Sequence, residues 1–130
     1  MTTGLASGVA NSLLTAVAKA TNYTAPVAFF VKLHLGDPGA AGTANPAANT
    51  TRKSTTFAAA SAGSISTSAD VVWTSVSNTE TYSHVSFWDA SSAGNFIGSC
   101  ALSASRAVTA GDDFTIPTGS LTLSLTPIAA

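Results

Sequence analysis

Charged side chains are scarce in this 130-residue sequence: they make up 8% of it, against about 25% in ordinary soluble domains. Five basic and six acidic residues leave a net charge of −1. That balance gives no basic stripe of the kind that nucleic acids and acidic membranes attract. A surface with so little charge repels a second copy only weakly, so the composition favours assembly over free diffusion.

Cysteine and long apolar runs are scarce as well. The single cysteine, Cys100, excludes an internal disulfide. The sequence has no run of about 18 apolar residues, so it predicts no transmembrane helix. Residues 4–20 end on small residues like those of a cleavage site. However, no positive charge precedes them, and we expect no cleaved signal peptide.

Motifs that carry chemistry are missing too. The residues able to bind a metal lack the spacing of ligand motifs such as CxxC or HExxH: His34, His84, Asp37, Asp89 and Cys100. No GxSxG elbow and no glycine-rich phosphate loop is present, and adjacent carboxylates on a strand point apart. The sequence therefore predicts no enzyme activity, no cofactor and no metal site.

An apolar stripe at helical spacing opens the chain. Its members recur every three or four residues: Leu5, Val9, Leu13, Ala16, Val17 and Ala20. The opposite side carries Ser, Asn, Thr and Ala rather than Glu and Lys. We predict an N-terminal helix and arm over residues 1–22, either wedged against a partner or covering one end of its own β-domain.

Residues 23–130 are predicted to form one antiparallel β-domain. The segment 27–35 alternates apolar residues with others and is the clearest strand. Further short strands are expected near 53–58, 64–66, 71–76, 80–89, 95–102, 106–109, 112–116 and 120–126. Such strands between Gly- and Pro-bearing turns are typical of an antiparallel β-sandwich or small barrel, so the predicted fold class is mainly β with an N-terminal α-helix.

The richest segment is a predicted hairpin over residues 80–102. On its first strand Tyr82, His84 and Trp88 share one face. Exposed, this face would be a candidate platform for a carbohydrate or a protein partner. Buried, the rings would fill the sandwich core, the interpretation we favour because large aromatics mostly go to cores. Cys100 is expected to be a small buried residue.

A turn and a loop follow the first strand. In Gly36–Asp37–Pro38–Gly39, proline fixes its own φ and the last glycine supplies the positive φ of a type II turn. The loop 40–49 has small residues and no hydrophobic period. We expect it to be exposed or laid across a partner.

Several of these segments together resemble a known kind of protein. They are Leu33 to Gly39, Gly42 to Asn45, Glu80 to Asp89, Gly94 to Gly98 and Ala107 to Asp112. They are similar to segments of small virion proteins of tailed bacteriophages, particularly those of actinobacterial hosts. The resemblance covers nearly the whole chain and implies an N-terminal helix followed by a Gly-Asp-Pro-Gly β-domain. It implies a tail-fibre-like, minor tail or capsid-decorating protein, and no catalytic residues.

From the resemblance and the low charge we expect a non-enzymatic virion protein that decorates the capsid exterior. Its expected partners are the major capsid protein and other copies of itself, as a homotrimer that binds through many weak contacts. The alternative is a minor tail or tail-fibre-like protein that binds a tail subunit or a host glycan. The candidate interface residues lie on the helix and on the loop: Leu5, Val9, Leu13, Val17, Asp37, Pro38, Asn45 and Pro46.

Overall fold

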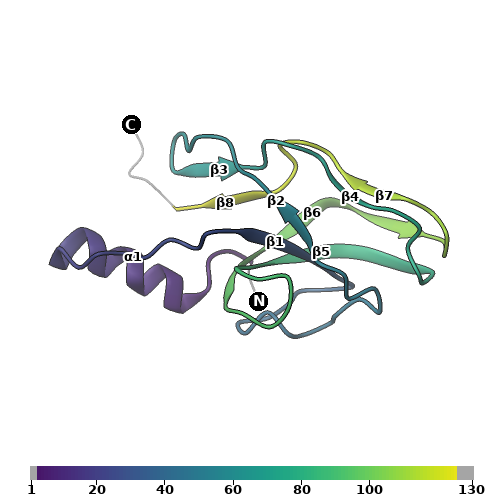
Figure 1. The fold of residues 1–130 in the computed structure, drawn as a ribbon, viewed down its shortest axis with the longest axis horizontal. Helices are drawn as coiled ribbons and strands as arrows, with labels where there is room; N and C mark the ends of the chain where they lie inside the picture. Colours follow the sequence, from purple (N-terminus) through teal and green to yellow (C-terminus); the bar gives the residue numbers. More distant parts are fainter. Residues whose placement is uncertain (1–2, 126–130) are drawn as a thin grey trace.

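The computed structural model describes residues 3–125, and within them it contains one helix and eight strands (Figure 1). The helix α1 (Ser7–Lys19) comes first. The strands follow in the order β1 (Phe29–His34), β2 (Lys53–Thr55), β3 (Ser64–Ser66), β4 (Val71–Trp73), β5 (Glu80–Trp88), β6 (Phe96–Val108), β7 (Phe114–Ile116) and β8 (Thr122–Ser124).

The strands form two layers, as predicted for a β-sandwich. One layer is a four-stranded sheet with the order β2-β1-β5-β6, in which every neighbouring pair is antiparallel. The other layer consists of two antiparallel pairs, β3-β8 and β4-β7, which lie along the upper side of the molecule in Figure 1. The predicted fold class is confirmed.

The core lies between these layers. Val31 and Leu33 of β1 and Val85 and Phe87 of β5 are fully buried on one face of the larger sheet. The second layer contributes apolar side chains to the same cluster: Val71, Trp73, Phe114, Ile116, Leu121 and Leu123. Cys100 is buried in this cluster too, which confirms its prediction as a small core residue.

The hairpin β5–β6 is the longest pairing, and it contains a large irregularity. Tyr82 pairs with Arg106 and His84 with Ala101, so one residue of β5 faces the four residues 102–105 of β6. The predicted separate strand 106–109 is therefore the end of β6. Such a bulge re-aims side chains, and Tyr82 joins the core beside Phe114, with ring centroids 5.0 Å apart.

The helix begins at Ser7, two residues after Leu5, the first residue of the apolar stripe. The preceding residues are extended and pair with the outer edge of β6: the Ser99 N–H donates to Gly4 O at 2.7 Å and the Ala6 N–H to Ile97 O at 2.8 Å. Leu5 lies opposite Gly98 in this pairing. The apolar stripe did not predict it, because Leu5 fits a helical face equally well.

Candidate interaction surface

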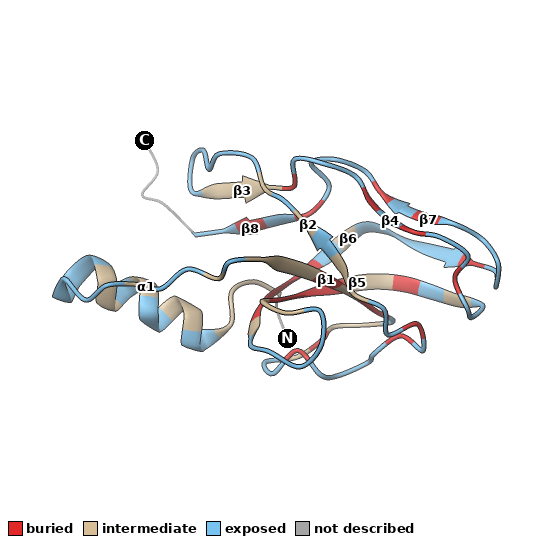
Figure 2. Ribbon diagram, viewed as in Figure 1, coloured by how far each residue is buried: buried red, intermediate tan, exposed pale blue. Residues whose placement is uncertain are grey.

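Helix α1 extends away from the sheets, and none of its residues is buried (Figure 2). Its C-cap residue Ala20 has a left-handed φ of 53°, and its only charged residue is Lys19. A helix of 13 residues is about the shortest that is even marginally stable in water, and most helices in proteins depend on packing of one face. Much of the apolar surface of α1 is uncovered in the isolated chain.

The predicted interface residues of the N-terminal segment divide into two groups. Leu5 and Val9 are half-buried and pack against the core cluster of their own domain. Val17 is 86% exposed, and the neighbouring Leu14, which was not among the predicted interface residues, is 67% exposed. Val27, in the connection to β1, is fully exposed. The outer end of the helix therefore presents the free apolar surface.

An apolar groove of about 410 Å³ lies where the helix approaches β3 and β8. Leu5 and Leu13 line it from the N-terminal side, and the other large side chains are Ile65, Leu123 and Leu125. Leu125 is more than half exposed. Leu13, one of the predicted interface residues, thus lies at the boundary between the domain's own packing and an open apolar surface.

The predicted interface residues after β1 belong to residues 36–49, which we call the 36–49 loop. Asp37 accepts a hydrogen bond from the Gly39 N–H at 2.8 Å, and Gly39 has the positive φ that the turn was predicted to need, 76°. The Asn45 side chain donates to the Asp37 carbonyl at 2.9 Å. Pro38 is buried, whereas Asn45 and Pro46 are exposed. Only part of this predicted surface is accessible to a partner.

The loop is also fastened to the sheet along its length. The Leu35 N–H donates to Asn45 O at 2.9 Å. The Glu80 carboxylate accepts bonds from the Ala48 N–H at 2.6 Å and the Asn49 N–H at 3.3 Å. Gly42 lies against the ring of Phe96. The loop was expected to be exposed or laid across a partner, and residues 40, 41, 43–46 and 48 are exposed. Its inner side nevertheless lies against its own four-stranded sheet, and Pro46 pairs with His34 at the end of β1.

A buried chain of hydrogen bonds lies beneath this loop. The Trp88 indole N–H donates to Ser86 Oγ at 2.7 Å, and that oxygen lies 2.7 Å from His34 Nε2. His34 Nδ1 lies 2.8 Å from the Ala44 carbonyl. Since a carbonyl only accepts, Nδ1 carries the proton, and Nε2 accepts the Ser86 hydroxyl hydrogen. We call this arrangement the His34 chain.

The sequence did not predict the His34 chain. It offered His34 only as a possible metal ligand without motif spacing, whereas in the structure His34 is fully buried. Burial, the first cause, lowers the pKa of its imidazole below 6.5, and the nearby Lys32 and His84 act in the same direction. Sequence alone could not reveal the chain, because its carbonyl comes from a loop residue ten positions away.

The candidate exposed aromatic face is not exposed. Tyr82 has no exposed surface and Trp88 only 8%, while His84 is half-buried and its Nδ1 lies 2.8 Å from Ser83 Oγ. The bulge turns Tyr82 into the core, whereas Trp88 lies with Ser86 under the loop. The burial that we favoured is confirmed for both rings, although Tyr82 belongs to the core cluster and Trp88 does not. These side chains therefore do not form the exposed aromatic platform considered as the alternative.

The Arg52 side chain packs over the indole ring of Trp88. Its guanidinium carbon lies 4.3 Å from the centroid of the indole ring, a cation–π geometry. Nη1 donates to the carbonyls of Ala90 at 2.8 Å and Ala93 at 2.7 Å. Burial lowers the pKa of Arg52, but an arginine stays charged in proteins. Arg52 thus joins the β5–β6 turn to the start of β2.

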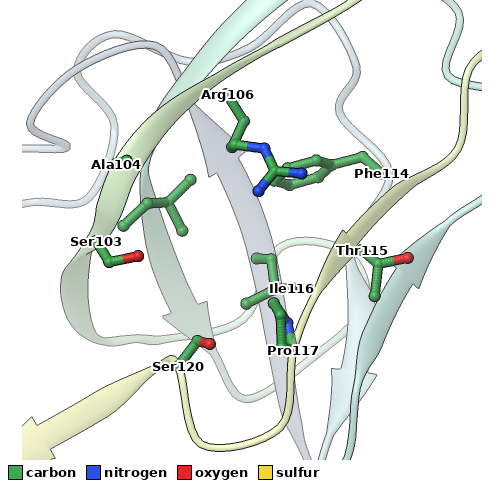
Figure 3. Close-up of a pocket in the computed structure, with 9 residues that line it drawn as sticks. Ser103, Ala104, Arg106, Phe114, Thr115, Ile116, Pro117 and Ser120 are labelled. Carbon is green, nitrogen blue, oxygen red and sulfur yellow. The ribbon is translucent and has the colours of Figure 1, made fainter.

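A small surface notch lies between β6 and β7. Figure 3 shows a notch between the bend of β6, with Ser103 and Ala104, and β7 with its following Pro117. Its volume of about 60 Å³ would hold about two water molecules. The described residues contain no group of three or more His, Cys, Asp or Glu able to hold a metal ion, and no helix among them could span a membrane.

The described residues thus form a small, charge-poor β-sandwich with a projecting helix, and this architecture does not by itself define a function. The family comparison does: the family described as podophage GP4 fiber I protein gp80 matches residues 4–124, and the chain belongs to it. The protein is thus a phage structural protein of the tail-fibre-like kind and a virion component. No curated protein matches the chain. The resemblance to phage virion proteins is confirmed; the actinobacterial host stays a prediction.

Proposed function

We propose that this protein is a subunit of a tail fibre on the virion exterior, joined to its neighbours through helix α1. The observation that carries the proposal is the uncovered apolar end of that helix. Leu14 and Val17 are mostly exposed, and the single charge of the helix is in its last turn. Burying such side chains stabilises an assembly by about 1.5–3 kcal/mol each.

The β-domain supplies a rigid body for this role. Its two layers, its fastened 36–49 loop and its bonded turns leave little backbone free to rearrange. The family description supports the fibre assignment over the minor tail and decoration alternatives. The partners follow as part of the proposal: further copies of the chain and another tail protein, with the apolar groove beside α1 as part of the contact.

Substitution of the exposed helix residues tests the proposal. The double variant Leu14→Ser, Val17→Ser should keep the fold, since neither side chain is buried, and should fail to enter particles in a complementation assay. The control is Val72→Ser, an exposed position on β4 outside this surface. Deleting residues 1–21 is a poorer test, because it also removes the pairing of Gly4 and Ala6 with β6. Normal incorporation of the double variant would contradict the proposal.

Capsid decoration is the second candidate function, favoured by the nearly charge-free sequence. The copy number in purified virions, measured relative to the major capsid protein by quantitative mass spectrometry, distinguishes the two. A ratio near one or a simple fraction of it would indicate decoration of the capsid lattice. A low number that matches the symmetry of the tail would indicate a fibre.

A further inference from the structure

The 36–49 loop is held over the sheet by an ionisable ring. His34 is fully buried, and both ring nitrogens are hydrogen-bonded, to the Ala44 carbonyl at 2.8 Å and to Ser86 Oγ at 2.7 Å. In this arrangement one nitrogen donates and the other accepts, so the ring must be neutral. The bond to Ala44 joins β1 to the middle of the loop, which makes the loop position dependent on the charge of one imidazole.

A second proton on His34 disrupts the bond to Ser86. Ser86 Oγ already accepts the Trp88 N–H, and if its second lone pair accepted a hydrogen from Nε2, the serine hydroxyl hydrogen would lose Nε2 as its acceptor. The imidazolium charge would also be cut off from water, and burying an unpaired charge is costly. The protonated ring is therefore less favourable in the site than in water.

The neighbouring charges do not compensate. Lys32 precedes His34 on the same strand, and His84 lies directly opposite His34 on β5; both oppose a positive charge there. Arg52 lies over Trp88, at the opposite end of the His34 chain from Ala44. The one carboxylate within the loop, that of Asp37, already accepts the Gly39 N–H. Each packed element therefore presents either a cation or an acceptor that is already engaged.

We propose that the His34 chain is an acid-sensitive latch: protonation of His34 expels its ring from the site and releases the 36–49 loop from the sheet. The release leaves most of the apolar core in place, because Val31, Leu33 and Phe87 lie on the other face of the sheet; Ala47 is the loop residue that belongs to this core. It exposes the Trp88 ring and the outer face of β1 and β5. The latch is a property of the isolated chain and does not depend on the proposed fibre function.

The direction of the pH dependence follows from linkage. The pKa of His34 in the folded protein lies below the value of 6.5 expected in the open state, where the ring is solvated. The closed loop is therefore fully stable above about pH 6.5 and loses stability as the pH falls below it. Because opening is coupled to the uptake of one proton, the open population increases about tenfold for each unit by which the pH falls. This increase ends at the folded-state pKa of His34.

Hydrogen exchange followed by NMR tests the latch at single amides. Between pH about 7.5 and about 5, protection factors of the Leu35, Ala44 and Ala47 amides, which are bonded within the loop or to β1, should fall by about tenfold per unit below pH 6.5. The Thr67 amide, bonded to Leu121 in the other layer, should keep its protection factor. Protection factors already correct for the intrinsic pH dependence of exchange. Unchanged loop protection in the wild type would overturn the proposal.

Two matched variants identify the histidine responsible. His34→Gln should remove the pH dependence of the loop, because a glutamine amide can bond to Ala44 and Ser86 but does not titrate. His84→Gln, the cross-strand neighbour, should leave the dependence unchanged. If His34→Gln does not fold, an NMR titration of the His34 imidazole resonances in the wild type still shows whether protonation of this ring accompanies loop opening. Titration of the His34 ring without loop opening, or loss of the dependence in His84→Gln, would overturn the latch.

Discussion

Gly42 lies so close to Phe96 that a Cβ on this glycine would come within 2.5 Å of the ring carbon Cδ1. Its φ of 72° is also in the region that side chains disfavour. The contact seats the middle of the 36–49 loop on the start of β6, two segments that are far apart in the sequence. The absence of a side chain at one position thus decides how closely the loop covers the sheet.

Gly42→Ala should therefore lower the free energy of unfolding by about 2–4 kcal/mol, since strain at positive φ and a clash with a ring add together. Chemical denaturation monitored by circular dichroism measures it. Gly119→Ala is the control: its φ of 82° is similar, but nothing lies within 4 Å of the added Cβ. Its loss should be about 1 kcal/mol. Equal losses in the two variants would show that the contact with Phe96 is unimportant.

Arg52→Met should destabilise the fold by about 1–3 kcal/mol. The variant keeps an apolar stem over Trp88 but removes the cation–π contact and the two bonds to the carbonyls of Ala90 and Ala93. Thermal unfolding measures the change. Arg106→Met, at an exposed position of β6, should change stability by less than about 0.5 kcal/mol. A similar loss at both positions would exclude the role given to Arg52.

Glu80→Gln should loosen the far end of the 36–49 loop. The carboxylate accepts the N–H groups of Ala48 and Asn49, and the Tyr82 hydroxyl donates to it at 3.3 Å. An amide offers one acceptor oxygen and points an NH2 group at the remaining donors, at a cost of about 1–2 kcal/mol. Hydrogen exchange at Ala48 should accelerate. In the control Asp113→Asn, a single exposed bond to Ser75 is affected, and Ala48 should exchange as in the wild type.

We expect a second loss of folding stability in acid, at a lower pH than the protonation of His34. Hydrogen bonds from the backbone and side chain of Asn95 lower the pKa of Asp89, and those from Thr118 lower the pKa of Asp70. A carboxyl whose folded-state pKa is depressed stabilises the fold above its unfolded value of about 3.8. That contribution is lost as the pH falls through the lower folded-state pKa.

Urea unfolding between pH about 5 and about 2 should therefore show a falling free energy of unfolding, with a shallower fall in Asp89→Asn. The asparagine keeps the side-chain size but does not titrate. Asp37→Asn is the comparison on the loop, because Asp37 accepts one backbone bond from Gly39 rather than two bonds. If Asp89→Asn and the wild type lose stability in parallel, the bonds to Asn95 do not stabilise the charged carboxylate.

Much of the fold followed from local pattern. The alternation in 80–102 predicted the central hairpin, and the helical stripe predicted α1, because periods of 2 and 3.6 residues are imposed by backbone geometry. The domain division at residue 22 stays a prediction. The ends of elements were less accurate: Leu5 became an extended residue and 106–109 became part of β6. Pairing with a distant strand decided both.

The candidate surface was predicted only in outline. The sequence indicated that the helix and the loop after β1 were unusual, and the helix does present exposed Leu14 and Val17. The sequence could not show that the loop covers its own sheet. That depends on Gly42 meeting Phe96 and on Glu80 reaching Ala48, contacts between residues more than 30 positions apart.

By itself, the sequence determined the mainly β fold class and most of the elements, because composition, periodicity and turn residues act locally, whereas the phage class came from the resemblance of whole segments. It also determined that no ordinary catalytic motif was present. Only the tertiary structure decided which faces were buried. The bulge opposite Ser83 turned Tyr82 inward, and the loop enclosed His34 and Trp88. The face a strand side chain occupies depends on register, and register is fixed by long-range pairing that no local pattern records.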